Sequence, residues 1–231
     1  MIFIYLLIFI LNIAEYYTKL TNYKARGVKV SLALGGWNDS KGDKYSRLAN
    51  SPKARAKFIR HVTKFLTKYN FDGLDLDWEY PSCWQTECKP ERSKDKAGFS
   101  RLVSELREAF SPLGLLLSAA VSPSKKIIEV GYEVVSLARD LDWIAVMTYD
   151  YHGHWDKKTG HVSPFYQHPE DELDYFNTVR QAVLYESDEM SCIRTTVSTT
   201  GWTPGPPGRS WSWGCRSTVR ASRWTPPWST D

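Results

Sequence analysis

Four runs of apolar residues divide the chain of 231 residues, and segments with helical patterning lie between them. The runs are VKVSLALGGW at 28–37, FDGLDLDWEY at 71–80, LLLSAAVSP at 115–123 and DWIAVMTYD at 142–150. Their centres are continuously apolar rather than alternating, which is typical of strands covered on both faces. We therefore predict that each run forms one strand of a parallel sheet.

The intervals between the runs predict helices. Ser51 is placed to cap a helix that begins at Pro52, because proline is favoured at a first helical position. One face of that helix carries Phe58, Ile59, Val62, Phe65 and Leu66. The next helix is expected to bury Phe99, Leu102, Val103, Leu106 and Phe110, and a shorter one is expected near 134–139. Repeated strand–helix units indicate a doubly wound sheet or a (β/α)8 barrel.

Polar and aromatic residues gather where three of the predicted strands end. These groups are Gly35-Gly36-Trp37, Asp77-Trp78-Glu79 and Tyr149-Asp150. The active sites of (β/α)8 barrels are built at the carboxyl ends of their strands. The groups therefore favour the barrel over the doubly wound sheet, and they favour a functional site over ordinary turn residues.

Three carboxylates, Asp75, Asp77 and Glu79, are spaced two residues apart within the second run. Side chains alternate along a strand, so the three share one face, and Leu74, Leu76 and Trp78 occupy the other. A metal site would need further ligands, and only Tyr149-Asp150 offers one. A row of ion pairs would need Lys or Arg at the neighbouring strand ends, and the sequence has none there.

Acid catalysis explains the carboxylate row best. Crowded carboxylates raise the pKa of one member, and a glutamic acid that stays protonated near neutrality can donate to a glycosidic oxygen. Trp37, Trp78 and Trp155 would provide flat apolar faces on which sugar rings stack.

The segment DGLDLDWEYP resembles the signature of the family-18 glycoside hydrolases, the chitinases, and SLALGG and MTYD resemble two further motifs of that family. LSAAVSPS and YHGHWDKKTGHVSP resemble the catalytic modules of invertebrate chitinases. The resemblance runs from about Tyr16 to Thr178. It implies an incomplete (β/α)8 barrel in which residues 16–178 supply about strands three to six.

The resemblance also implies a retaining, substrate-assisted hydrolysis of β-1,4-N-acetylglucosamine linkages, the known exception to the two-carboxylate scheme. Glu79 would be the general acid and base, and Asp77 would hold the acetamido N–H, with Asp75 behind it sharing a proton. Tyr149 would bind the acetamido carbonyl. The implied substrate-binding residues are Asp150, Trp78, Tyr80, Gly36, Trp37 and Met147. Asp72 is expected to shape the start of the row.

The same resemblance implies a partner and a location. The partner is chitin or a chito-oligosaccharide, the protein is a monomer outside the cell, and neither a metal nor a cofactor is needed. A formal charge of +4 is too small to indicate nucleic acid, and no membrane partner is expected. Asn38-Asp39-Ser40 is a glycosylation sequon in a predicted rim loop. Cys83 and Cys88 form either a local disulfide or two free thiols.

The two ends of the chain depart from the family. Residues 1–15 are a leader or an artefact, and a secretion signal, a buried strand and a gene-model error remain open for them. Residues 197–231 lack Leu, Ile, Met and Phe but hold five of the ten Trp. A frame one base earlier turns each Trp codon into one ending in TG, and consistent codons then spell a family-like segment. We interpret 179–231 as intron read-through followed by a frame-shifted tail, and we expect it to be disordered.

Three hypotheses of function follow. The first is a chitinase, although a chain with about half a barrel is expected to show little or no hydrolysis by itself. The second is a chitin-binding protein that does not cut, and the presence of Glu79 argues against it because such relatives typically lose this acid. The third is an inactive gene fragment.

Overall fold

The computed structural model describes residues 15–84, 87–157 and 159–166. A helical stretch over 15–21 leads into the 3-10 helix η1 (Asn22–Arg26). The elements that follow are β1 (Ser31–Gly35), α2 (Lys44–Asn50), α3 (Pro52–Lys68), β2 (Gly73–Asp77), β3 (Cys83–Trp84), β4 (Glu87–Cys88), η2 (Pro90–Arg92), α4 (Lys94–Phe110), η3 (Ser111–Leu113), β5 (Leu116–Val121), α5 (Lys125–Gly131), α6 (Val134–Asp140) and β6 (Trp143–Val146).

Strands β1, β2, β5 and β6 form one parallel sheet in that order. The four predicted strands and their parallel pairing are therefore confirmed. Each strand is shorter than its apolar run. At the end of β1, Gly35 and Gly36 have φ values of 125° and 92°, which turn the chain out of the ladder.

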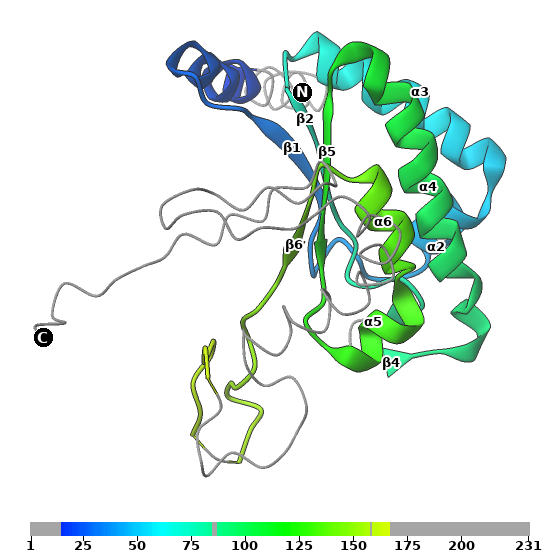
Figure 1. Ribbon diagram of the computed structural model, residues 1–231, viewed down its shortest axis with the longest axis vertical. Coiled ribbons are helices and arrows are strands. Elements are labelled where there is room, and N and C mark those ends of the chain that lie inside the picture. Colours follow the sequence, from blue (N-terminus) through cyan, green and yellow to red (C-terminus); the bar gives the residue numbers. More distant parts are fainter. Residues whose placement is uncertain (1–14, 85–86, 158, 167–231) are drawn as a thin grey trace, which may run out of the picture.

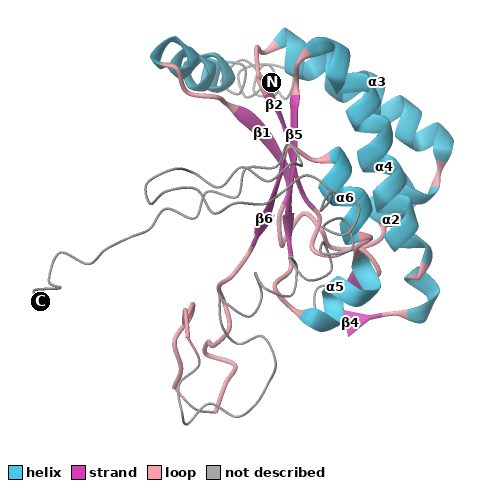
Figure 2. Cartoon of the chain, viewed as in Figure 1, coloured by secondary structure: helices cyan, strands magenta, loops and turns pink. Residues whose placement is uncertain are grey.

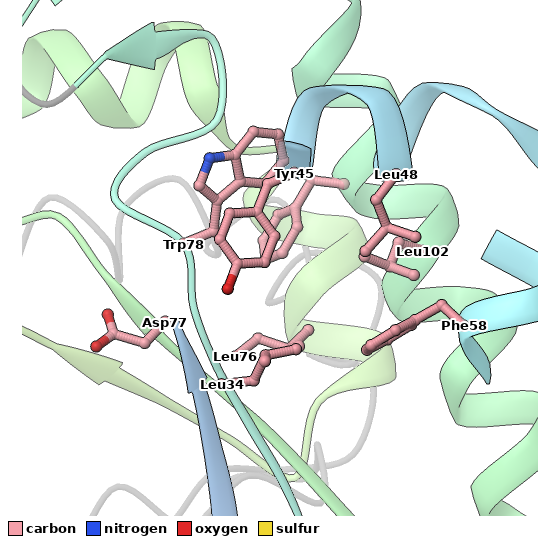
Figure 3. A pocket seen from close by; sticks show the side chains of 9 residues that line it. Leu34, Tyr45, Leu48, Phe58, Leu76, Asp77, Trp78 and Leu102 are labelled. Atoms are coloured by element: carbon pink, nitrogen blue, oxygen red, sulfur yellow. The ribbon is translucent and has the colours of Figure 1, made fainter. Parts of the chain in front are cut away.

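The helices α2, α3, α4 and α6 lie on one side of this sheet (Figures 1 and 2). Pairing in register places Leu34 beside Leu76, and Gly35 beside Asp77. Because side chains alternate, the leucines face the helices and the aspartate faces the opposite side. Figure 3 shows this directly, since Leu34 and Leu76 lie with Phe58 and Leu102 while the Asp77 carboxylate points away from them.

Helices α3 and α4 form as their sequence patterns predict. The Ser51 hydroxyl accepts a hydrogen bond from the Ala54 N–H at 3.3 Å, and Pro52 is the first residue of α3. Val62 and Leu66 are buried, while Phe58, Ile59 and Phe65 pack partly buried against the core. All five apolar residues predicted for α4 are buried.

Some elements were not predicted from the sequence. These are α2, α5 and the small hairpin of β3 and β4, in which Cys83 and Cys88 form a disulfide. Within the described residues no helix is long and apolar enough to cross a membrane. The interpretations of 1–15 and 179–231 concern residues that, apart from residue 15, lie outside the described part of the chain.

Candidate active site

The site begins where β1 and β2 end side by side. The Gly36 N–H donates to the Asp77 carbonyl at 2.7 Å, which continues the pairing of the two strands by one bond. A Cβ atom on Gly36 would lie 3.7 Å from Asp77 Oδ2. The main chain at Gly36 therefore lies close to the carboxylate of Asp77, and the exposed Trp37 follows directly after it.

Asp75 and Asp77 lie on the same face of β2, but their surroundings differ. The Ser118 hydroxyl of β5 donates to the Asp75 carboxylate. Asp77 Oδ1 is buried and has no hydrogen-bond partner among the described residues. Burial raises the pKa of Asp77 above its usual range, and the charge of Asp75 raises it further. The Asp77 carboxyl group thus holds its proton more firmly than an exposed aspartate does, and its buried oxygen is an acceptor without a partner among the described residues.

Glu79 lies just beyond β2 and its side chain is buried, with 9% of the residue exposed. Its N–H donates to the Ser40 hydroxyl at 2.9 Å, and its peptide bond to Tyr80 is cis. Burial raises the pKa of Glu79, the charges of Asp77 and Asp150 raise it further, and a hydrogen bond with Tyr80 opposes the shift. The net result is a glutamic acid that holds its proton more firmly than an exposed one does.

Tyr149 and Asp150 follow β6, which lies on the opposite side of β2 from β1. Both residues lie near the carboxylates at the end of β2. Burial raises the pKa of the Tyr149 phenol, and the charges of Asp77, Glu79 and Asp150 raise it further, because all three lie near it. Burial is also the main cause that raises the pKa of the Tyr80 phenol, and the charge of Glu79 raises it further. The structure therefore brings together the residues from two motifs that are about 70 positions apart in the sequence.

The aromatic and apolar residues named for the site in the sequence analysis differ in their exposure to solvent. Trp37 and Tyr149 are 44% and 52% exposed, so their rings are open to solvent beside the carboxylates. Trp155 is also exposed. Met147 is buried in the core, and its N–H extends the ladder by donating to the Val121 carbonyl at 3.0 Å.

The prediction that Trp78 offers a stacking face to a sugar does not fit the structure. Trp78 is 6% exposed and lies on the helix side of β2, in a recess with Tyr45 and Phe99 (Figure 3). The alternation that directs Asp77 toward the open face directs the next residue away from it. Trp78 is therefore a core residue that supports the strand from behind.

Asp72 has the structural role that was expected of it. It accepts a hydrogen bond from the Val30 N–H at 2.9 Å and pairs with Lys29 and Lys24 at 3.2 and 3.3 Å. Burial alone would raise the pKa of Asp72, but these partners outweigh it and the pKa is lowered. Asp72 joins the start of β2 to the segment before β1.

In the described ranges, no three His, Cys, Asp or Glu side chains are grouped to hold a metal ion.

Sequence reasoning missed three polar residues that support the site. Ser40 and Ser118 contact Glu79 and Asp75, and Asp95 is fully buried at the start of α4. Asp95 accepts hydrogen bonds from the Ser46 hydroxyl at 2.6 Å and from Asn50 Nδ2 at 2.5 Å, and more weakly from the Ser82 N–H at 3.4 Å. Only an unusual acid in an otherwise apolar helix face hinted at Asp95.

Comparison with known proteins identifies the family of this chain. The model of the glycosyl hydrolases family 18 matches residues 7–201. "Probable chitinase 10" of Drosophila melanogaster is 64% identical over 163 residues, which make up 71% of this chain and 7% of that protein. "Probable chitinase 2" of the same organism is 45% identical over 68% of this chain and 32% of its own length.

Solved structures show the same relationship. Catalytic domain 2 of the Ostrinia furnacalis Group II chitinase, a mutant in complex with penta-N-acetylchitooctaose, is 56% identical with a TM-score of 0.74 over 76% of this chain and 45% of that one. The Ostrinia furnacalis Group IV chitinase in complex with allosamidin is 36% identical with a TM-score of 0.69. The chain thus spans less than half of the relatives it matches. It belongs to family 18 of the glycosyl hydrolases, whose fold is the (β/α)8 barrel, and it holds part of that barrel.

Proposed function

We propose that this chain carries the acid-donating part of a chitinase active site, which hydrolyses β-1,4-N-acetylglucosamine linkages with retention of configuration. The observation that carries the proposal is the environment of Glu79. Its carboxyl group is buried at the carboxyl end of β2, and burial together with Asp77 and Asp150 raises its pKa. A general acid needs a proton that it still holds near the working pH.

The other groups supply what an acetamido-assisted reaction needs. Asp77 has a buried acceptor oxygen without a partner, which suits the acetamido N–H of a substrate. The exposed Tyr149 hydroxyl would donate to the acetamido carbonyl, so that this oxygen is aimed at the anomeric carbon. As the bond to the leaving sugar breaks, the Glu79 proton passes to the leaving oxygen and the acetamido oxygen bonds to the anomeric carbon. Water then attacks that carbon, the bond between the carbon and the acetamido oxygen breaks so that the acetamido group is restored, and one proton of the water passes to the Glu79 carboxylate.

The names of the relatives support chitin as the substrate class. One of the solved relatives is described in complex with a chito-oligosaccharide, and another was solved in the presence of chitooligosaccharides. We further propose that the enzyme works outside the cell as a monomer. The disulfide between Cys83 and Cys88 supports that location, because such bonds persist mainly in oxidising compartments.

The test uses a completed catalytic module, in which residues 16–166 replace the matching segment of catalytic domain 2 of the Ostrinia furnacalis Group II chitinase. The wild-type module should release N-acetylated sugars from a chito-oligosaccharide with the β configuration retained, as followed by NMR. Glu79→Gln should lower kcat by about 100-fold or more and leave oligosaccharide binding intact, since general acid catalysis contributes about 10²–10⁴-fold. Full turnover by Glu79→Gln, or an inverted product, would contradict the proposal.

A second set of variants separates catalysis from binding. Glu133→Gln changes an exposed acid at the start of α6, far along the chain from the carboxylate row, and serves as the matched control. It should turn over the oligosaccharide at the wild-type rate. If wild type binds but never cuts, the function is that of a chitin-binding protein.

A further inference from the structure

We propose that Ser40 is a positioning residue for the reaction, because its hydroxyl fixes the main chain that carries Glu79. This inference rests on the proposed function for its effect on turnover, but its structural part can be measured without any substrate. Ser40 is also the third residue of the sequon Asn38-Asp39-Ser40. Loss of a glycan on Asn38 is therefore an alternative explanation for any effect of replacing Ser40, and the test must separate the two.

The hydroxyl of Ser40 makes two contacts with the chain at the end of β2. It accepts a hydrogen bond from the Glu79 N–H at 2.9 Å, and it lies 3.4 Å from the Asp77 carbonyl, to which it can donate. Ser40 is only 3% exposed, so water does not readily replace it. The Ser40 side chain therefore takes the place of a neighbouring strand at the point where the β1–β2 ladder has ended.

The loop that carries Ser40 is itself held in place. The Ser40 N–H donates to the Gly36 carbonyl at 2.9 Å, which closes a turn directly after β1. The carboxylate of Asp39 accepts from the Tyr45 hydroxyl at 2.5 Å and pairs with Lys44. The centroid of the Tyr45 ring in turn lies 5.8 Å from the centroid of the Trp78 ring. The serine thus presents a hydroxyl whose position is set before any substrate arrives.

Loss of the hydroxyl would release the Glu79 amide at a buried position. An unpaired buried N–H is unfavourable, so the chain would move toward a new partner or toward water. Either movement changes the distance from the Glu79 carboxyl to the substrate oxygen. A displacement of about 1 Å can cost about 100-fold in rate. Movement toward water would also reduce the burial that raises the pKa of Glu79.

Amide hydrogen exchange in the full chain tests the structural step. In the wild-type chain the Glu79 amide should be protected, and Ser40→Ala should speed its exchange by at least about 10-fold. The amides of β2 before Asp77 should keep their rates. A fast-exchanging Glu79 amide in the wild-type chain would overturn the proposal, and this measurement does not depend on the variant folding. An unchanged Glu79 rate in Ser40→Ala would overturn it as well.

Three variants in the completed module test the catalytic step. Ser40→Ala removes the hydroxyl and the sequon, Asn38→Gln removes only the sequon, and Ser40→Thr keeps both. We expect Ser40→Ala to lower kcat about 10- to 100-fold with KM within about twofold, and to move the alkaline limb of its pH profile to lower pH. Asn38→Gln should match wild type, and Ser40→Thr should recover most of the rate.

The outcomes separate this inference from the proposed function. Loss of activity in Asn38→Gln equal to that in Ser40→Ala would assign the effect to the glycan and overturn the positioning role. Full activity in Ser40→Ala, beside an inactive Glu79→Gln, would overturn the Ser40 proposal alone. Full activity in Glu79→Gln would overturn the proposed function, whatever Ser40→Ala shows.

Discussion

Gly35 lies directly beside Asp77, so close that a Cβ atom on the glycine would stand 2.0 Å from the Asp77 carbonyl oxygen. Gly35 also has a φ of 125°, a conformation that residues with a side chain rarely adopt. The close approach of β1 to β2 at their carboxyl ends therefore depends on the missing side chain. This contact sets the place of Asp77 relative to Gly36 and Ser40.

The first prediction concerns Gly35→Ala. Gly27 is a matched control, since its φ is 78° and no atom lies within 4 Å of the Cβ position. Gly27→Ala should cost about 1 kcal/mol of unfolding free energy from its backbone conformation alone. Gly35→Ala should cost about 1–3 kcal/mol more, because the added atom must push two paired strands apart. Denaturant unfolding measures both, and equal losses would mean that the strands separate easily.

The second prediction concerns pH and follows from the raised pKa of Glu79. An acid whose pKa is raised by folding contributes stability that is present below its unfolded pKa of about 4.3 and is lost as the pH rises through the folded value. Glu79→Gln removes the ionisable group, so the variant does not lose this stability as the pH rises. The variant should therefore be more stable than wild type at pH 7.5, with the difference vanishing near pH 3.

Urea unfolding at a series of pH values checks this, and Asp77→Asn should behave in the same way because the pKa of Asp77 is also raised. A variant less stable than wild type at pH 7.5 would show that the Glu79 carboxylate is stabilised by the fold. Such a result would remove the main support for its role as the acid.

The sequence was sufficient for the parts of this site that depend on local pattern. Alternation within one strand places Asp75 and Asp77 on one face and Leu76 on the other. The same rule, applied one residue further, also places Trp78 among the helices. An aromatic ring next to carboxylates is typical of a sugar-binding site, but the alternation of the strand buries the Trp78 ring instead.

Other features depend on contacts that no local pattern reveals. Ser40 meets Glu79 across 39 positions, and Ser118 meets Asp75 across 43. A serine in a loop or a strand has no signature that tells which distant group it will bind. These pairs depend on the strand order of the sheet, because the contacts form only between segments that lie next to β2, namely the loop after β1 and the strand β5.

The third prediction concerns Ser118, which is fully buried and donates to Asp75. Ser118→Ala leaves the Asp75 carboxylate without this donor, and the loss should destabilise the fold by about 1–3 kcal/mol. Ser100→Ala is the control, because Ser100 is also buried but its hydroxyl donates to the Lys96 carbonyl within α4 at 3.3 Å. A smaller effect at Ser118 than at Ser100 would contradict a structural role for the Asp75 contact.

The fourth prediction concerns Arg55 and Glu105, which join α3 to α4. Arg55 Nε donates to both carboxylate oxygens, Nη2 donates to Oε1 at 2.8 Å, and the Arg55 side chain is only 5% exposed. Glu105→Gln leaves a buried guanidinium without its counter-charge, whereas Glu15→Gln breaks an exposed pair with Lys19. Glu105 is itself 37% exposed, so we expect a loss of about 2 kcal/mol for Glu105→Gln.

The control Glu15→Gln should leave the free energy of unfolding nearly unchanged, because exposed pairs along a helix contribute little. Replacing both partners, as Arg55→Met with Glu105→Leu, should recover most of the stability lost in Glu105→Gln, since no buried charge remains uncompensated. Denaturant unfolding of the four proteins measures this. If the double variant is less stable than Glu105→Gln, then the hydrogen bond from Arg55 Nη1 to the Ala49 carbonyl at 2.7 Å, which ties the end of α2 to α3, is the more important contact of the arginine.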